Sequence, residues 1–126
     1  MDRLLKSAVA GGLLACLFAS PAFATGDASK GQALFVRCQV CHTNTAGAPN
    51  RVGPNLFGVV GRKAGSVPSY SYSPAMKKSG LTWDQPTLSR YLMAPQTVVP
   101  GTKMTFAGFS DPKQSEDVAA YLATLK

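Results

Sequence analysis

Apolar residues recur at helical spacing near the C-terminus and predict a helix with one buried face. They follow the i, i+3, i+4, i+7 pattern and comprise Val118, Tyr121, Leu122 and Leu125. Ser110 or Asp111 can cap the first turn, and the pattern predicts that the helix runs to Leu125.

A second helix is predicted over residues 30–40, near the start of the chain. Asp27 or Ser29 precedes it and can accept hydrogen bonds from the free N–H groups of its first turn. The apolar residues that would bury one face of this helix include Leu34 and Phe35.

A third helix is predicted over residues 86–94. Thr82 or Asp84 can cap it, and Pro86 falls in the first turn, where proline is favoured. Pro95 is expected to end the helix, because proline cannot continue the backbone hydrogen-bond pattern.

Two Gly- and Pro-rich segments, residues 43–80 and 95–110, are predicted to be loops. The longer one holds six Gly and four Pro, and a compact domain seldom carries so long an irregular segment without a functional reason. No alternating strand pattern exceeds a few residues, so the sequence predicts an all-α fold of three to five short helices and long loops. So little helix in a small chain indicates that the loops wrap a large apolar group.

The first 24 residues are predicted to be a secretory signal peptide. A charged start precedes a short apolar run, and Ala22-Phe23-Ala24 fits a signal-peptidase site with cleavage after Ala24, which leaves residues 25–126 as the domain. The alternative is lipid tethering through Cys16, whose preceding residues match a lipobox poorly. No later apolar run approaches the ~20 residues of a membrane span.

Composition supports one globular domain with an excess of positive charge. Of the 126 residues, 45% are hydrophobic and 15% are charged, and the formal net charge is +7. This balance excludes a disordered chain. Three Cys are too few for a disulfide framework. The charge favours acidic partners, and nothing beyond it indicates nucleic-acid binding.

The segment Cys38-Gln39-Val40-Cys41-His42 has the C-x-x-C-H spacing of covalent c-type haem attachment. Each thiol can add to one haem vinyl group, and His42 then lies beside the iron as the proximal ligand. A dithiol redox pair would require a βαβ pattern that is absent, and a zinc site requires about four ligands. We therefore predict one haem c, attached through Cys38 and Cys41 in the periplasm.

His42 is the single histidine, so another residue must fill the second axial position unless that position is open. The candidates are Met76, Met93, Met104, a lysine or an open site. Met93 falls in a predicted helix and Met76 in a basic loop or short helix, where a packing role is the more frequent one. Met104 lies in a Pro- and Gly-rich loop between two helices, and we predict it as the ligand.

The chain resembles a class I cytochrome c of the mitochondrial type, in its bacterial periplasmic form, from Gly31 to Lys126. The motifs that carry the resemblance are Cys38-x-x-Cys41-His42, Gly53-Pro54-Asn55-Leu56, Gly61-Arg62-Lys63, Trp83, Tyr91-Leu92 and Pro100-Gly101-Thr102-Lys103-Met104. The resemblance implies the class I cytochrome c fold, wrapped around one covalently bound haem.

The resemblance also implies roles for residues around the haem. The Pro54 carbonyl would accept the Nδ1 proton of His42 and so fix the ring. The donors to the haem propionates would be Arg62, Tyr72 and Trp83. Tyr91 and Thr102 would place hydroxyl groups beside the Met104 sulfur.

Two further implications concern packing and docking. Gly31 and Phe35 would bring the first helix against the last, near Tyr121 and Leu122. Mitochondrial members carry lysines at the positions of residues 96–97, which are Gln and Thr here, so part of the usual basic docking ring is missing.

These features predict a one-electron carrier and no enzyme activity. His/Met ligation would raise the potential of an iron that cycles between the ferric and ferrous states. The resemblance implies a quinol–cytochrome c oxidoreductase as donor and a terminal oxidase, photosynthetic reaction centre or peroxidase as acceptor. Basic residues around the haem edge would steer the carrier to acidic patches on these partners. We expect a monomer without a membrane span.

Two other functions stay open from the sequence. One is a ligand-binding or peroxidase-like haem protein, in which the Met ligand is labile or absent. The other is a docking module tethered to a single enzyme complex through Cys16. The red absorption band of a ferric iron–Met bond distinguishes the first, and the mass of the mature N-terminus tests the second.

Overall fold

The computed structural model of the chain describes residues 11–12, 15 and 26–126. Cys16 and the predicted cleavage site after Ala24 therefore lie outside the described residues. So does the rest of the predicted leader, apart from residues 11, 12 and 15. The described part contains short helices joined by long loops and no strand ladder, with one isolated bridge between Lys63 and Thr82. This confirms the predicted all-α class.

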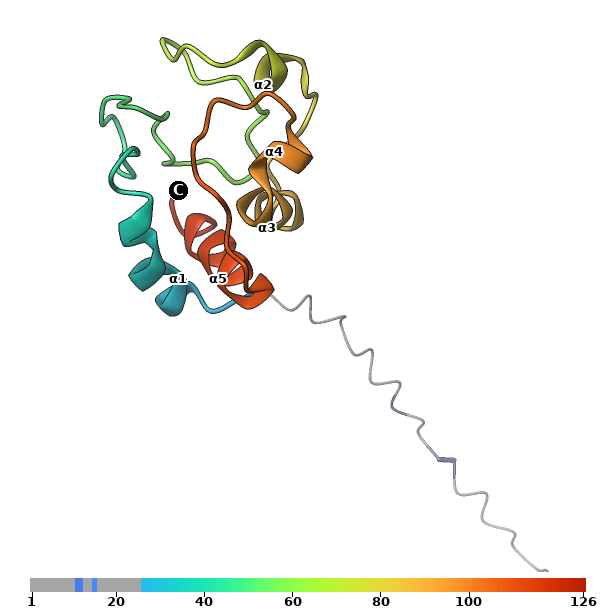
Figure 1. Cartoon of the computed structure of the whole chain (residues 1–126). Coiled ribbons are helices and arrows are strands. Elements are labelled where there is room, and N and C mark those ends of the chain that lie inside the picture. The colour runs from blue at the N-terminus through green and yellow to red at the C-terminus, as the bar shows by residue number, and fades with distance from the viewer. Residues whose placement is uncertain (1–10, 13–14, 16–25) are drawn as a thin grey trace, which may run out of the picture.

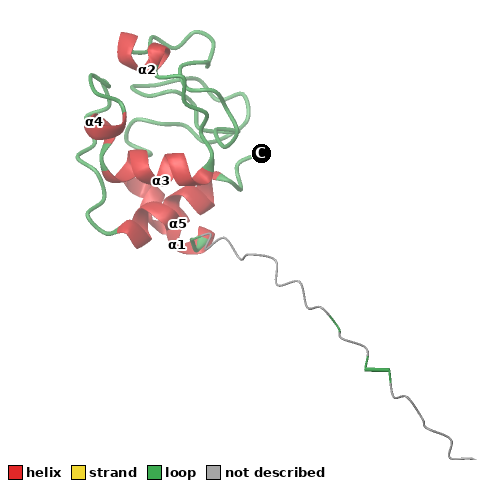
Figure 2. Cartoon of the chain, turned by 90° about the vertical axis from the view of Figure 1, so that its right-hand side faces the viewer, coloured by secondary structure: helices red, strands yellow, loops and turns green. Residues whose placement is uncertain are grey.

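The helical elements are α1 (Ala28–Leu34), the 3-10 segment η1 (Phe35–Arg37), α2 (Pro74–Lys78), α3 (Gln85–Met93), α4 (Pro95–Val98) and α5 (Pro112–Leu122). Figures 1 and 2 show that α1, α3 and α5 gather at one end of the domain, while α2, α4 and most of the loops form the other end. No helix in the described part of the chain is both long and apolar enough to cross a bilayer.

The first helix begins earlier and ends earlier than predicted. Asp27 is its cap, since its carboxylate accepts from the N–H groups of Ser29 and Lys30. The prediction of one helix to residue 40 was wrong, because the chain tightens into η1 and then turns. In that turn His42 N–H donates to the Cys38 carbonyl over 2.9 Å. The turn brings the three residues of the C-x-x-C-H motif to one end of the helix.

The segment after α3 contains a helix that the sequence analysis assigned to a loop. Asp84 caps α3 by accepting from the Thr87 N–H. Ala94 then breaks the helix with φ of −151°, and Pro95 begins α4 instead of a loop. Proline suits this position because the first N–H of a helix has no intrahelical partner.

A short helix also lies within the region that was predicted to be loop from residue 43 to 80. Ser73 caps α2 by accepting from the Met76 N–H, and Pro74 occupies its first turn. Met76 is buried in the core. Of the two predictions for Met76, a basic loop or a short helix, the structure therefore confirms the short helix.

The last helix is capped by Asp111, as predicted, but it ends at Leu122 and not at Leu125. Beyond Leu122 the chain forms a turn, and the Leu125 carbonyl accepts from the Gly58 N–H over 2.6 Å. The last turn tightens, because the N–H groups of Thr124 and Leu125 donate to the carbonyls three residues before them, Tyr121 and Leu122, and the α-helical pattern ends there.

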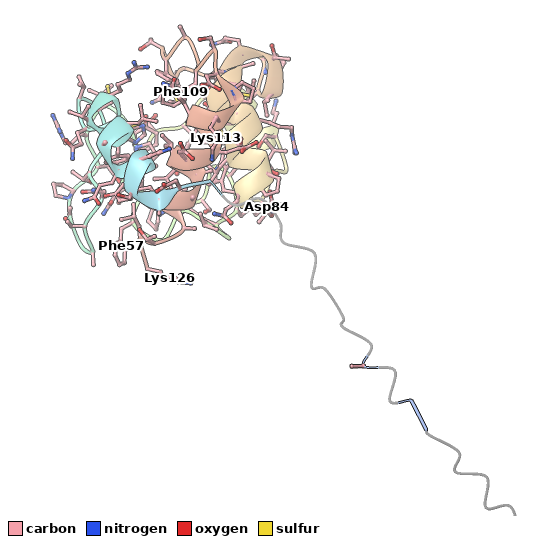
Figure 3. All side chains as sticks on the ribbon, turned by 90° about the horizontal axis from the view of Figure 1, so that it is seen from below. Phe57, Asp84, Phe109, Lys113 and Lys126 are labelled. Atoms are coloured by element: carbon pink, nitrogen blue, oxygen red, sulfur yellow. The ribbon has the colours of Figure 1, made fainter. Side chains whose placement is uncertain are left out.

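Helix α5 packs against both α1 and α3 and forms the base of the domain. Figure 3, seen from below, shows α5 lying between the other two helices, with Lys113 labelled at its start. A Cβ at Gly31 would lie 1.9 Å from the Asp117 carbonyl oxygen, so α1 crosses α5 at backbone contact. Phe35 packs on Tyr121 with ring centroids 5.2 Å apart, as the resemblance implied.

Candidate cofactor site

One pocket of about 520 Å³ lies between the helical base and the loops. This volume falls within the ~300–1,000 Å³ of typical cofactor sites. All ten residues predicted for the site line it: Cys38, Cys41, His42, Pro54, Arg62, Tyr72, Trp83, Tyr91, Thr102 and Met104. Met76 also lines it, whereas Met93 is not among its lining residues in the described chain.

The two cysteines are free, half-buried thiols on one wall of the pocket. Burial raises the pKa of the Cys38 thiol to about 11, against the opposing charge of Arg37. A dithiol redox centre needs a reactive thiolate, so this environment disfavours that alternative. The described residues bring no three His, Cys, Asp or Glu side chains together as a metal cluster.

A hydrogen bond at one nitrogen orients the His42 ring. Its Nδ1 lies 2.7 Å from the Pro54 carbonyl oxygen and donates to it. Burial lowers the pKa of His42, while the Pro54 carbonyl acts in the opposite direction. With the proton on Nδ1, the Nε2 lone pair is free to bind a metal.

Gly53 is a site residue that the sequence analysis did not single out. A Cβ at this position would lie 2.2 Å from His42 Cε1. Any side chain would therefore displace the imidazole. The signal was present in the Gly53-Pro54 motif, but only the folded structure shows that the glycine faces the ring.

A pair of hydroxyl groups lies beside the segment that carries Met104. Tyr91 Oη and Thr102 Oγ1 are 2.7 Å apart and buried. Thr102 Oγ1 also accepts from the Met104 N–H at 3.4 Å, and the Thr102 carbonyl accepts from Gln96 Nε2 at 2.9 Å. Burial raises the pKa of Tyr91, so its hydroxyl stays protonated at neutral pH. These contacts shape the loop that presents the Met104 side chain to the pocket.

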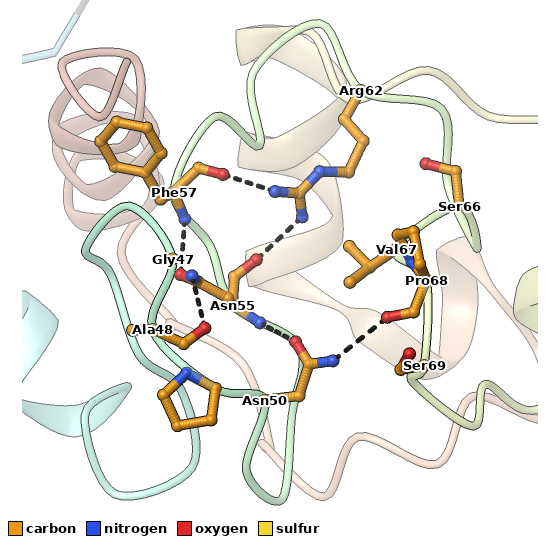
Figure 4. Close-up of a pocket in the computed structure, with 11 residues that line it drawn as sticks. Gly47, Ala48, Asn50, Asn55, Phe57, Arg62, Ser66, Val67, Pro68 and Ser69 are labelled. Atoms are coloured by element: carbon orange, nitrogen blue, oxygen red, sulfur yellow. Dashed lines mark hydrogen bonds between the residues drawn. The ribbon is translucent and has the colours of Figure 1, made fainter.

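Arg62 forms a positively charged part of the pocket wall. Its two terminal nitrogens donate to the Asn55 and Phe57 carbonyls at 3.0 and 2.6 Å, as Figure 4 shows. Tyr72 Oη accepts from the Val67 N–H at 3.1 Å. Burial raises the pKa of Tyr72 and lowers the pKa of Arg62.

Arg62 also borders a second, more open hollow of about 630 Å³, whose lining residues are drawn in Figure 4. Its wall includes Asn50, which donates to the Pro68 carbonyl at 3.4 Å and accepts from the Asn55 N–H at 2.9 Å. Of the ten predicted site residues, only Arg62 lines this hollow.

The main pocket suits a large, flat, mostly apolar group with a few charged substituents. Two thiols and an imidazole lie on its wall, Trp83 is buried with its ring centroid 5.0 Å from that of Tyr91, and Arg62 supplies a positive charge. This donor set fits a haem that is attached through thioethers and ligated by nitrogen and sulfur. Fold and site together define a c-type haem protein.

Comparisons with known proteins agree with that class. The sequence model of the family described as "Cytochrome c" matches residues 28–126. Cytochrome c2 of Rhodomicrobium vannielii is 48% identical, covering 97% of this chain and 96% of the relative. Cytochrome c2 of Rhodoblastus acidophilus is also 48% identical, covering 80% and 94%. Cytochrome cH from Methylobacterium extorquens superposes with a TM-score of 0.74 at 52% identity, covering 79% and 99%.

The chain belongs to the cytochrome c family, as its motifs predicted. It is therefore a haem protein of electron transport.

Proposed function

We propose that this chain is a periplasmic one-electron carrier with a single haem c, bound covalently through Cys38 and Cys41. His42 and Met104 would be the axial ligands. The observation that carries the proposal is the gathering of all ten predicted site residues around one pocket, with His42 Nδ1 bonded to Pro54. When bound, the haem supplies an iron that gains and loses one electron.

The residues of this chain give that iron its setting. Pro54 orients the imidazole and makes it a better donor. A neutral thioether from Met104 favours the ferrous state, and so does the apolar wall, because a buried net charge is costly. Trp83, Arg62 and Tyr72 would hold the charged substituents. With both axial positions filled, no enzymatic turnover of a small molecule at iron is expected.

Haem extraction tests the covalent attachment. The haem should stay with the polypeptide when the purified holoprotein is treated with acid–acetone, because thioethers resist acid. A Cys38→Ala, Cys41→Ala variant should release any haem it binds. Free extraction from the wild type would contradict the proposal.

Export to the periplasm is supported by the basic, apolar and small-residue sequence of the first 24 residues. Mass spectrometry of the mature protein should find Thr25 at the N-terminus. A lipidated Cys16 would support tethering instead.

We propose a quinol–cytochrome c oxidoreductase as the electron donor and a terminal oxidase, reaction centre or peroxidase as the acceptor. The support is the positive charge around the pocket mouth, where Arg37 and Lys103 line the opening. Mild crosslinking on membranes followed by identification of the partners tests this choice.

A further inference from the structure

Tyr70 connects the loop that orients His42 with the loop that carries Met104. Its hydroxyl donates to the Val52 carbonyl at 2.7 Å, and Val52 directly precedes the Gly53-Pro54 pair that holds His42. On the other side, Lys103 Nζ lies 4.5 Å from the centroid of the Tyr70 ring, and Lys103 directly precedes Met104. One side chain that lines the pocket therefore contacts both the segment that orients His42 and the segment that carries Met104.

Neighbouring contacts reinforce this connection. The Lys103 ammonium also donates to the Ser71 carbonyl, and the Tyr70 ring packs edge-on against Tyr72 with centroids 4.7 Å apart. On the far side, Arg51 donates to the Gln39 carbonyl at 2.9 Å and so fastens the Val52 loop to the C-x-x-C-H turn. These contacts together connect the loop that carries Met104 with the turn that carries Cys38 and Cys41.

The backbone before Tyr70 supports a positioning role. Ser69 has φ of +64°, the one non-glycine residue with positive φ in the described chain. Such a conformation is unfavourable for a residue with a side chain and persists where its surroundings impose it.

The chemistry of the Lys103 contacts keeps positive charge at the mouth. No Asp or Glu occurs in residues 28–83 or 85–110. Lys103 is held by a ring face and a carbonyl, which attract a cation without neutralising it. A carboxylate in place of the ring and the carbonyl would neutralise Lys103, which is one of the charges proposed to steer acidic partners.

We propose that Tyr70 is a positioning residue that keeps the Met104 loop closed over the pocket. Through Lys103 and Val52 it sets how readily an external ligand replaces Met104 at the iron. This inference rests on the proposed function, in which Met104 is a ligand.

Azide binding to the ferric holoprotein tests the proposal. Azide can bind only when the Met104 loop opens, so its apparent affinity rises with the open fraction. Tyr70→Phe removes the Val52 hydrogen bond and should raise azide affinity about threefold. Tyr70→Leu also removes the ring under Lys103 and should raise it about tenfold. The readouts are the red Met band and the azide titration.

Tyr121→Phe is the matched control. It also deletes a tyrosine hydroxyl with a hydrogen bond, here from Asn44 Nδ2 at 2.9 Å, but Tyr121 lies on α5 away from the mouth. Its azide affinity should stay within about twofold of the wild type. If Tyr70→Leu folds poorly, Lys103→Gln removes the ammonium alone and should give about a threefold rise.

Two results would overturn the proposal: azide affinity that is unchanged in Tyr70→Leu or in Lys103→Gln, or an equal rise in Tyr121→Phe. Failure of the proposed function looks different. In that case the wild type itself would lack the red band, or Met104→Ala would retain it.

Discussion

At the scale of single residues, His42 shows how one side chain is fixed by its neighbours. The Pro54 carbonyl sets the proton on Nδ1, and Gly53 provides the space that the ring occupies. Neither contact depends on a charged partner, so the ring is oriented without adding a negative charge to the pocket. The uncharged environment favours a neutral imidazole, the form that binds iron.

Met104 should be the residue whose loss opens the iron. Met104→Ala should abolish the red absorption band of the ferric protein, lower the reduction potential and allow CO or azide to bind readily. Absorption spectra and redox titration measure these effects.

Met76→Ala and Met93→Ala are the control variants for Met104→Ala. Met76 is 9% exposed and belongs to the core, so its truncation should reduce the free energy of unfolding by about 2–5 kcal/mol but preserve the band. Loss of the band in Met76→Ala alone would show that the ligand was assigned incorrectly.

At the scale of elements, the crossing of α1 and α5 determines where the C-x-x-C-H turn lies. The two helices approach so closely because Gly31 has no side chain facing the Asp117 backbone. Phe35, which is 1% exposed, fills the space next to this crossing. The turn with the two cysteines follows directly, so the geometry of the pocket wall depends on this helix pair.

Gly31→Ala should push the two helices apart. The new Cβ would lie within 2.5 Å of two backbone atoms of Asp117, which cannot rotate away as a side chain can. Overpacking should reduce the free energy of unfolding by about 1–3 kcal/mol, even though alanine is the better helix former. Denaturant unfolding measures the loss. The exposed neighbour variant Gln32→Ala should change stability by less than about 0.5 kcal/mol, and equal effects would contradict the close crossing.

Asp117 ties the start of α1 to α5 and makes this junction sensitive to acid. Burial alone would raise the pKa of its carboxyl group, but hydrogen bonds from the Asp27 N–H at 2.7 Å and the Lys113 ammonium at 3.0 Å hold the pKa below its usual value. A lowered pKa means that the carboxylate stabilises the fold above pH ~4, and that this contribution is lost as pH falls through the folded-state pKa.

Asp117→Asn should therefore be less stable than the wild type at neutral pH, by about 1–2 kcal/mol. The difference should shrink as pH falls below about 4. Denaturant unfolding across pH 2–7 measures it. Glu116→Gln removes the same charge one residue away and should show a smaller, flatter difference. A constant gap between Asp117→Asn and the wild type at every pH would refute the linkage.

At the scale of the whole molecule, the acidic residues of the predicted domain are confined to the helical base. They are Asp27, Asp84, Asp111, Glu116 and Asp117. Three of them cap helices α1, α3 and α5, whose starts belong to the helical base. The one ion pair in the described chain, Lys113–Asp117, lies there too. The cations at the pocket mouth are consequently free to attract a partner.

The rate of electron transfer to an acidic terminal oxidase should fall as ionic strength rises. Salt shortens the Debye length to about 8 Å at physiological strength and screens long-range attraction. Arg37→Glu, at the mouth, should slow the second-order rate more than Lys30→Glu, in the first turn of the same helical segment. Stopped-flow kinetics at several salt concentrations measure both. A rate independent of salt would exclude steering.

Local patterns were sufficient to predict the haem-attachment chemistry and the capping residues of three helices. The C-x-x-C-H spacing indicates haem attachment because both sulfurs and the imidazole belong to five consecutive residues. The caps Asp27, Asp84 and Asp111 were each among the predicted candidates, since a cap acts on N–H groups two or three residues away. Met104 was predicted from its loop setting and from the single histidine, and the remaining pocket residues only through the family resemblance.

Contacts between distant residues decided the rest. Beyond the end of α5 the Leu125 carbonyl accepts from the distant Gly58 N–H, and α1 ends early where the chain turns into the cysteines. The contacts of Tyr70 with Val52 and Lys103 join segments that lie 18 and 33 positions away along the chain. Sequence alone determined the cofactor chemistry, because that depends on adjacent residues. Only the tertiary structure determined how the pocket is closed, because closure depends on which distant loops meet.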